Sequence, residues 1–282
     1  VTYAAGVLYW ATDAGRIYRD DGDTLEIAAS GLPLSLSAND TWLYWTDTAP
    51  GQSATVRRVP AAGGASEIVS VAPSGLLWIR VAGEFAYWTT RLGAIRRAPV
   101  AGGAGETVVS DPTPGDFSGL AVGEGFVYWT RYTEGTIKRA SLATRTISVL
   151  ASGQELPWAI AVDATHAYWT NYTAPNGAVK KVPLTGGDVV SLAEGQGEPW
   201  SVAVDGSRVY WVNQFNPGAG GQLWRSGLDG ECPALLAEGG EQMMEVALGA
   251  GAAFVTRDDG LVATDGGAMR AGVLLRVDTG DL

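Results

Sequence analysis

The sequence predicts an all-β protein, a seven-bladed β-propeller of four-stranded antiparallel blades, and three observations lead to that fold class. The pair Tyr-Trp recurs in near-constant steps of 35, 43, 41, 40 and 42 residues, and a divergent copy, Ala253-Phe254, follows after 43 more. Each copy is made of short segments rich in Val, Ile, Thr, Tyr and Trp. Gly, Pro, Asn and Asp separate these segments, and such punctuation is a strand and turn signal. Four short strands in a period of about 40 residues are typical of propeller blades. The six pairs begin at Tyr9, Tyr44, Tyr87, Tyr128, Tyr168 and Tyr210.

The elements of one copy follow a fixed order. A first apolar strand follows a turn, as at 158–162 or 200–204, and the Tyr-Trp strand comes second, as at 166–170. The third strand has the form Gly-x-Ile/Val-basic-basic, seen as "GAIRRAPV", "GTIKRASL" and "GAVKKVPL". The fourth is a β-rich run such as "TISVLASG" or "DVVSLAEG". No segment between them has helical period and length, so we expect no helices.

We expect one domain over residues 1–282. The last blade can be aligned with the other copies in two registers, because either "GLVATDGG" or "GVLLRVDTGDL" can be its third strand. We favour the second, which leaves that blade without an outer strand in this sequence, and a segment N-terminal to residue 1 could then supply it. The predicted blades cover residues 1–32, 33–75, 76–116, 117–156, 157–198, 199–241 and 242–282.

The repeated tryptophans indicate packing between blades. A buried aromatic side chain of about 150–250 Å² stabilises by roughly 4–6 kcal/mol gross at about 25 cal/mol per Å². A four-stranded blade is too small to bury its own faces, so a Trp at one repeated position would wedge between neighbours. We assign this role to Trp10, Trp45, Trp88, Trp129, Trp169 and Trp211.

Composition excludes several function classes. The net charge of −11 argues against nucleic-acid binding, which needs a basic face. No apolar run reaches the roughly 20 residues of a membrane helix. One cysteine, Cys232, excludes a disulfide framework, and we expect it to be an inert turn or core residue. The single histidine, His166, leaves little room for a Ser-His-Asp relay. We expect a monomer.

The segment "LYWTD" at Leu43–Asp47, with "PWAIAVDATHAYWTN" and the following Gly-x-Val-basic strand, resembles the YWTD repeats of low-density-lipoprotein-receptor-type propellers. The resemblance covers nearly the whole chain and implies fold more than function. This chain departs from that family in two features. Propellers of the family have six blades, whereas this chain has seven copies of the repeat. The Asp of the motif is present only at Asp47. Bacterial seven-bladed NHL-like and antibiotic-lyase-like propellers are therefore also in view. We expect a bacterial protein located outside the cytoplasm, extracellular or periplasmic.

Ligands of propellers usually bind on the face formed by loops that precede the first strands and follow the second strands, since loops on a rigid scaffold carry function. We therefore expect a binding site there, at the mouth of the central channel. Aromatic side chains would stack on a ligand, with carboxylates and amides at the rim. The candidate residues are Trp158, Trp200, Phe117, Trp78, Tyr132, Tyr172, Phe215, Asn171, Asn213, Glu155 and Glu198.

This set favours a binding or interaction module for a protein, peptide or glycan, without a cofactor and without an assigned catalytic residue. A cationic group would suit it through cation–π contacts. The alternative is a calcium-dependent lactonase- or esterase-like hydrolase, or a lyase, in which Glu155, Glu198, Asn171 and Asn213 supply some of the six to eight oxygen ligands of Ca²⁺. A purely structural role also stays open, with Trp158 and Trp200 closing the channel mouth and the acids acting as solvated turn residues.

Overall fold

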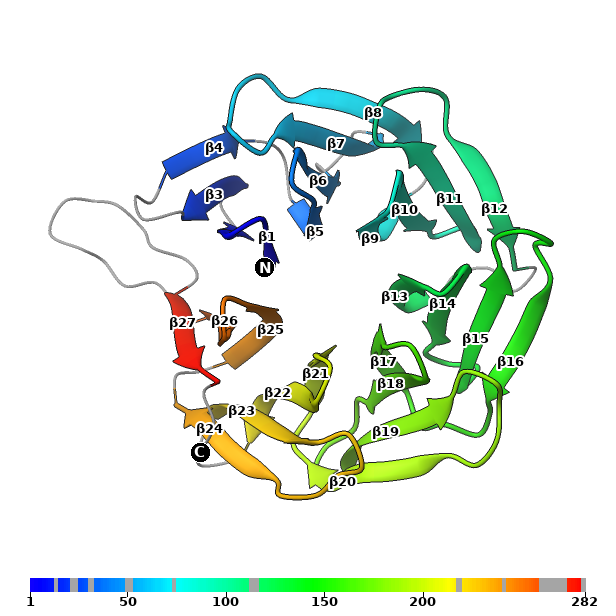
Figure 1. Ribbon diagram of the computed structural model, residues 1–282, viewed down its shortest axis with the longest axis vertical. Coiled ribbons are helices and arrows are strands. Elements are labelled where there is room, and N and C mark those ends of the chain that lie inside the picture. The colour runs from blue at the N-terminus through cyan, green and yellow to red at the C-terminus, as the bar shows by residue number, and fades with distance from the viewer. Residues whose placement is uncertain are drawn as a thin grey trace, which may run out of the picture. The chain divides into compact units, whose positions relative to one another are not determined.

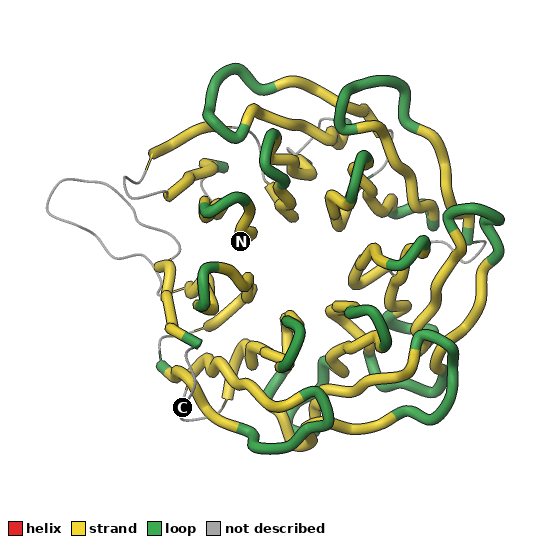
Figure 2. The backbone as a smooth tube through the Cα atoms, viewed as in Figure 1, coloured by secondary structure: helices red, strands yellow, loops and turns green. Residues whose placement is uncertain are grey.

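A computed structural model describes residues 1–12, 15–20, 25–29, 33–48, 53–72, 75–111, 117–216, 220–239, 242–258 and 273–279. All regular structure in these ranges is β-strand, joined by turns and loops (Figure 2). In this part of the chain there is no helix that could span a membrane. The predicted all-β class is confirmed.

Seven antiparallel sheets follow one another along the chain, and within each sheet the strands pair in chain order (Figure 1). Six sheets have four described strands and the last has three. These sheets are the blades of a seven-bladed β-propeller, as the Tyr-Trp spacing predicted. We number them blades 1 to 7 in chain order.

The chain divides into two compact units, Val1–Trp129 with Arg139–Ser148 (unit 1) and Thr130–Lys138 with Val149–Leu282 (unit 2). In unit 1 the first strands of consecutive blades, β1, β5, β9 and β13, lie against one another. Blades 1 to 3 consist of β1 (Thr2–Ala4), β2 (Val7–Ala11), β3 (Arg16–Asp20), β4 (Leu25–Ala29); β5 (Pro33–Ala38), β6 (Trp42–Asp47), β7 (Ala54–Pro60), β8 (Glu67–Ala72); β9 (Leu76–Ala82), β10 (Phe85–Thr90), β11 (Ala94–Pro99) and β12 (Glu106–Ser110).

Blade 4 has residues in both units, and blades 5 to 7 belong to unit 2, where β17, β21 and β25 lie against one another in turn. Their strands are β13 (Phe117–Gly123), β14 (Phe126–Arg131), β15 (Thr136–Ser141), β16 (Ile147–Ala151); β17 (Pro157–Val162), β18 (His166–Asn171), β19 (Gly177–Pro183), β20 (Val190–Gln196); β21 (Pro199–Val204), β22 (Arg208–Asn216), β23 (Gly220–Gly227), β24 (Ala234–Glu238); β25 (Gln242–Gly249), β26 (Ala252–Asp258) and β27 (Val273–Asp278).

The last sheet settles the register of blade 7. Strand β27 pairs antiparallel with β26, with Ala253 opposite Val277 and Val255 opposite Leu275. The segment "VLLRVD" is therefore the third strand, as favoured from its match to "GAVKKVPL". The competing segment "GLVATDGG" lies outside the described residues.

Two kinds of turn lead into the second strands of six blades, all except blade 3. In one, an Asp or Asn side chain accepts backbone hydrogen bonds: Asp163 Oδ1 lies 2.7 Å from Thr165 N and 2.8 Å from His166 N. Such a turn satisfies the donors that precede the strand. Asp205 and Asn39 do the same in blades 6 and 2. The other kind has two successive residues at positive φ, a geometry that suits tight hairpins, and occurs at Ala5-Gly6, Glu124-Gly125 and Ala250-Gly251.

The hydrophobic core forms between consecutive blades, at seams made by the Tyr-Trp pairs. Trp45 packs in one cluster with Tyr9 of the preceding blade, and Trp88 packs with Tyr44. Tyr87 with Trp129, and Tyr168 with Trp211, repeat this pairing between the Trp of one blade and the Tyr of the blade before it. Trp45, Trp88, Trp129, Trp169 and Trp211 are at most 1% exposed and Trp10 is 8% exposed, which confirms their predicted packing role.

A second device holds neighbouring blades together: a Tyr hydroxyl and a basic side chain donate to one carbonyl of the next blade. Tyr44 Oη lies 3.2 Å and Arg58 Nη1 lies 2.6 Å from the carbonyl oxygen of Val100. Arg58 also pairs with Glu67 and lies over the ring of Trp42. We call this arrangement the carbonyl clamp. Tyr9 and Arg19 form the same carbonyl clamp with Ala61. In later blades a basic side chain alone reaches the next blade: Arg225 donates to the carbonyl of Thr279, and Lys181 pairs with Asp229.

Candidate functional site

The loops that lead into β17 and β21 have matching geometry. Leu156 and Glu198 each stand just before a first strand, with φ of 46° and 52°. This left-handed conformation costs a non-glycine residue roughly 1 kcal/mol or more. Their carbonyls accept hydrogen bonds from Tyr172 N (3.0 Å), which directly follows β18, and from Gln214 N (2.9 Å), which lies near the end of β22. These two hydrogen bonds hold the loop before β17 to the residue after β18, and the loop before β21 to β22.

Threonines of the Tyr-Trp-Thr segments hold the start of β17. The register of β17 against β18 shifts between its first and fourth residues, and such an irregularity re-aims side chains. Thr130 Oγ1 donates to the carbonyl of Trp158 at 2.6 Å, and Thr170 Oγ1 accepts from Ala159 N at 3.1 Å. The backbone of Trp158 is therefore fixed on both sides.

Four half-buried aromatic residues of unit 2 contact one another, and we call them the aromatic cluster: Tyr132, Trp158, Tyr172 and Trp200. The rings of Trp158 and Trp200 are 4.6 Å apart between centroids and tilted by 42°. Tyr132 meets Trp158 edge-on at 5.6 Å, and Tyr172 lies 5.7 Å from Trp158 and 5.4 Å from Trp200. Tilted and edge-on pairs at these separations are favourable.

Polar groups border the aromatic cluster. The hydroxyl of Tyr172 lies 3.1 Å from Gln214 Oε1 and 3.4 Å from Glu198 Oε2. Gln214 Nε2 in turn donates to Met244 Sδ at 3.2 Å. Burial, and then the negative charge of Glu198, raise the pKa of Tyr172, so its hydroxyl stays protonated at neutral pH. The cluster thus combines apolar ring surface with a carboxylate.

Two predicted aromatic residues lie in unit 1. Phe117 is 3% exposed and packs on Trp129 with ring centroids 6.2 Å apart. Trp78 is half-buried against the same hydrophobic cluster. Both belong to the packing of blades 3 and 4. Phe215 lies in β22, but its side chain is outside the part that the structure describes.

The predicted polar residues occupy different surroundings. Asn213 is 2% exposed and donates to Gln196 Oε1 at 3.0 Å. Asn171 is 4% exposed, accepts from Trp169 Nε1 at 3.0 Å, and lines a cavity together with the exposed Glu155. Glu198 borders the aromatic cluster instead. The described residues contain no group of three or more His, Cys, Asp or Glu that could hold a metal ion, and calcium stays a prediction.

The other singled-out residues do not add to a site. His166 begins β18, and its Nδ1 lies 2.7 Å from Thr165 Oγ1. Cys232 is exposed in a loop with φ of 49°, so it is a turn residue rather than a core residue.

Comparisons with known proteins give a fold but no family. No family model matches the chain, and no curated protein matches it. A solved structure described as a nidogen/laminin complex aligns with a TM-score of 0.66 and 16% identity, over 86% of this chain and 97% of that one. The computationally designed Ika8 protein aligns with a TM-score of 0.65 and 14% identity, over 90% of this chain and 80% of that one.

The likeness is one of fold. Because 1174 solved chains match, the architecture by itself does not select a function. The side chains that border the aromatic cluster carry the functional argument.

Sequence reasoning missed two sets of residues around this site. The threonines that fix the first strands, Thr130 and Thr170, follow the Tyr-Trp pair directly, and this repetition was their signal. The second set surrounds the cavity beside Asn171, where Lys180 and Glu194 lie. Lys180 belongs to the basic pair that recurs in the third strands, and this repetition gave no sign that Lys180 differs from its equivalents.

Proposed function

We propose that this protein is a binding module whose aromatic cluster receives a basic side chain, Arg or Lys, from an exposed segment of a partner protein. The observation that carries the proposal is the mutual packing of four half-buried rings with Glu198 at their edge. A guanidinium or ammonium over such rings gains about 0.5–2 kcal/mol through cation–π attraction.

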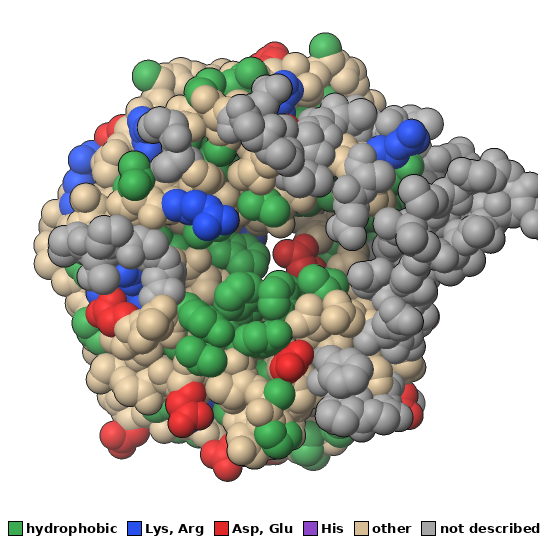
Figure 3. All heavy atoms as spheres, turned by 180° about the vertical axis from the view of Figure 1, so that it is seen from behind, with side chains coloured by type: hydrophobic (Ala, Val, Ile, Leu, Met, Phe, Trp, Pro, Cys, Tyr) green, Lys and Arg blue, Asp and Glu red, His purple; other side chains and the backbone are tan. Residues whose placement is uncertain are grey.

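Charge also supports a cationic partner. The chain carries a net charge of −11, and an acidic protein attracts basic segments over long range. Glu198 supplies a local carboxylate that can pair with the bound cation. Hydrophobic side chains also gather on one face of the molecule (Figure 3), as expected for a surface that contacts other proteins.

The solved nidogen/laminin structure is a complex, so a propeller of similar fold occurs in a protein assembly. At 16% identity this likeness carries no partner over to the present chain. It supports only the general class of an interaction module.

The test is a titration with N-acetyl-arginine amide, with N-acetyl-norleucine amide as the neutral probe of similar length. Binding is followed by NMR at the indole N–H signals. The arginine probe should bind and the norleucine probe should not. Trp158→Ala and Trp200→Ala should each weaken binding about tenfold, which corresponds to about 1.4 kcal/mol.

Trp78→Ala is the matched control, because Trp78 is also a half-buried Trp but packs in unit 1. It should leave binding unchanged. Glu198→Gln keeps the shape of the site and should weaken binding several-fold, so the test stands even if a Trp variant unfolds. Equal binding of both probes, or preferential binding of a neutral sugar, would overturn the proposal.

A further inference from the structure

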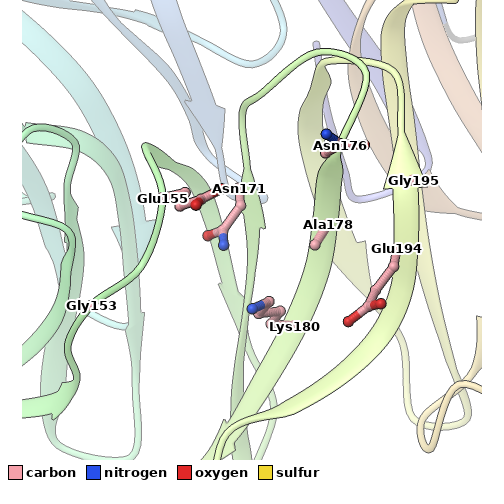
Figure 4. A pocket seen from close by; sticks show the side chains of 8 residues that line it. All are labelled: Gly153, Glu155, Asn171, Asn176, Ala178, Lys180, Glu194 and Gly195. Carbon is pink, nitrogen blue, oxygen red and sulfur yellow. The ribbon is translucent and has the colours of Figure 1, made fainter.

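A polar cavity of about 350 Å³ lies in unit 2, apart from the rings of the aromatic cluster. A volume of this size is in the range of small-molecule sites. Figure 4 shows its lining: Asn171 from β18 and Lys180 from β19 lie between Glu155 and Glu194 in this view. The lining is Gly153, Glu155, Asn171, Asn176, Ala178, Lys180, Glu194 and Gly195.

At the positions equivalent to Lys180 in blades 2, 3 and 4, the basic side chain has a polar partner within the protein. Lys180 stands opposite the Trp of the Tyr-Trp pair, and so do Arg57 in blade 2 and Arg96 in blade 3. Arg57 Nε lies 3.7 Å from Asp47, and Arg96 donates to the carbonyl of Gly105 at 3.1 Å. In blade 4 the equivalent Lys138 pairs with Glu134 at 2.9 Å. Within the described residues, Lys180 makes no ion pair.

Blade 6 shows how the same space is closed. Its residues at the positions of Lys180 and Ala178 are Trp224 and Gln222. Trp224 stacks on Trp211 with centroids 6.2 Å apart and an angle of 8°, and its Nε1 donates to Gln222 at 3.0 Å. Blade 5 has Ala178 in place of Gln222 and Lys180 in place of Trp224. These side chains leave the space open, and the cavity is the result.

The donors in the cavity are oriented by the blade itself. Asn171 Oδ1 accepts from Trp169 Nε1, which leaves its Nδ2 directed to the cavity near Lys180 (Figure 4). In blade 6 the matching Asn213 Nδ2 is used instead in a hydrogen bond to Gln196. One ammonium and one amide N–H group therefore face the same space in blade 5, as an anionic carboxylate requires.

We propose that this cavity binds a small zwitterion of the amino-acid class. The ligand's carboxylate accepts from Lys180 Nζ and Asn171 Nδ2, and its ammonium donates to Glu155 or Glu194. A simple anion does not fit, because two carboxylates line the cavity. A metal cation does not fit, because Lys180 repels it. Apolar ligands do not fit, because Ala178 and two glycines are the only apolar lining.

The lining carries one formal positive and two formal negative charges, so a ligand of net charge zero or +1 balances it best. L-Lysine is therefore the probe, measured by calorimetric titration. Cadaverine, which is L-lysine without its carboxylate, and acetate are the partial probes. L-Lysine should bind at least about tenfold more tightly than cadaverine, because the charge-assisted bonds to the carboxylate are missing in the latter.

Lys180→Gln should weaken L-lysine binding about tenfold or more and leave cadaverine binding unweakened. Glu194→Gln should weaken both. The double substitution Ala178→Gln with Lys180→Trp copies blade 6 and should abolish binding. Asp188→Asn, an exposed acid of blade 5 outside the lining, is the control for charge and should change nothing.

The variant Trp158→Ala distinguishes the cavity from the aromatic cluster, because it alters the cluster and should leave L-lysine binding to the cavity intact. The cavity proposal is overturned if the unchanged protein does not bind L-lysine, or if the blade-6 copy binds it as tightly. It is also overturned if Ca²⁺ binds in the cavity and is lost in the blade-6 copy.

Discussion

At the residue scale, Asp163 shows how one carboxylate organises the start of a Tyr-Trp strand. Its Oδ1 accepts from the backbone of Thr165 and His166, and its Oδ2 accepts from Tyr168 Oη at 2.7 Å. Partial burial opposes ionisation of Asp163, but the hydrogen bonds from Tyr168, Thr165 and His166 outweigh it and lower its pKa. Burial and Asp163 together raise the pKa of Tyr168.

This lowered pKa predicts an acid-dependent stability. A carboxyl whose folded pKa lies below its unfolded value of about 3.9 stabilises fully above that value, and the stabilisation is lost as pH falls through the folded pKa. Asp163→Asn should cost about 1 kcal/mol at pH 7, because the amide cannot accept equally from Tyr168. Urea unfolding at pH 7 and pH 3 should show a smaller pH difference in the variant than in the parent.

Asp188→Asn is the control, because this exposed residue has no hydrogen bond to its side chain among the described residues. It should leave the difference between pH 7 and pH 3 unchanged. If Asp163→Asn also leaves it unchanged, the turn hydrogen bonds do not contribute as inferred.

The sequence was least informative at this scale. Asp163 and Asp205 stand five residues before their tyrosines, a spacing that is readable once the turn is known. Thr130 and Thr170 are equivalent in sequence, yet one donates to the next blade and the other accepts within its own. Hydroxyl direction depends on the neighbouring backbone, so the repeat pattern alone could not assign these contacts.

At the element scale, the carbonyl clamp between blades 2 and 3 predicts non-additive energetics. Tyr44 and Arg58 donate to the same carbonyl of Val100. Tyr44→Phe alone should cost about 1 kcal/mol, since the carbonyl keeps one partner. Arg58→Met should cost more, because it also removes the ion pair with Glu67 and the contact with the ring of Trp42. The double variant should cost more than the sum, because the carbonyl then loses both protein donors.

Guanidinium unfolding of the parent, the two single variants and the double variant measures this coupling. Leu92→Ala, at an exposed apolar side chain of blade 3, provides a control away from the clamp. Strict additivity would mean that the two donors act independently.

Strand order and the packing role of the tryptophans were predictable, because both follow from a repeated pattern of apolar residues. The cavity of blade 5 was not. The segment "GAVKKVPL" matches the other third strands. Only comparison with Trp224 and Gln222 of blade 6 shows that the space beside Lys180 is not filled by an aromatic ring. The difference between Lys180 and its equivalents lies in the side chains around each residue, because the residue type at this position is basic in all four of blades 2 to 5.

At the scale of the whole molecule, the net charge predicts how fast a basic partner segment associates. The net charge of −11 and the isoelectric point of about 4.5 make attraction of a basic segment dependent on salt. The association rate of an arginine-rich peptide should fall by about tenfold or more between low salt and about 0.5 M NaCl, while dissociation changes less.

Stopped-flow fluorescence of a dye-labelled peptide measures both rates. A peptide of the same length with its arginines replaced by glutamine is the control, and its slower association should not depend on salt. If the arginine-rich peptide associates at the same rate at both salt concentrations, long-range attraction does not guide the partner.

The seams described above give a blade that keeps the Tyr-Trp pair one half of a joint at each of its two faces. A blade presents its Tyr to the blade that follows and its Trp to the blade before, as Tyr44 and Trp45 do in neighbouring clusters. A duplicated copy that keeps this pair therefore carries both halves of the joint with it. Residues elsewhere in the copy are then free to diverge: the position opposite the Trp holds a lysine in blade 5 and a stacked Trp in blade 6, while the joint between these two blades is kept.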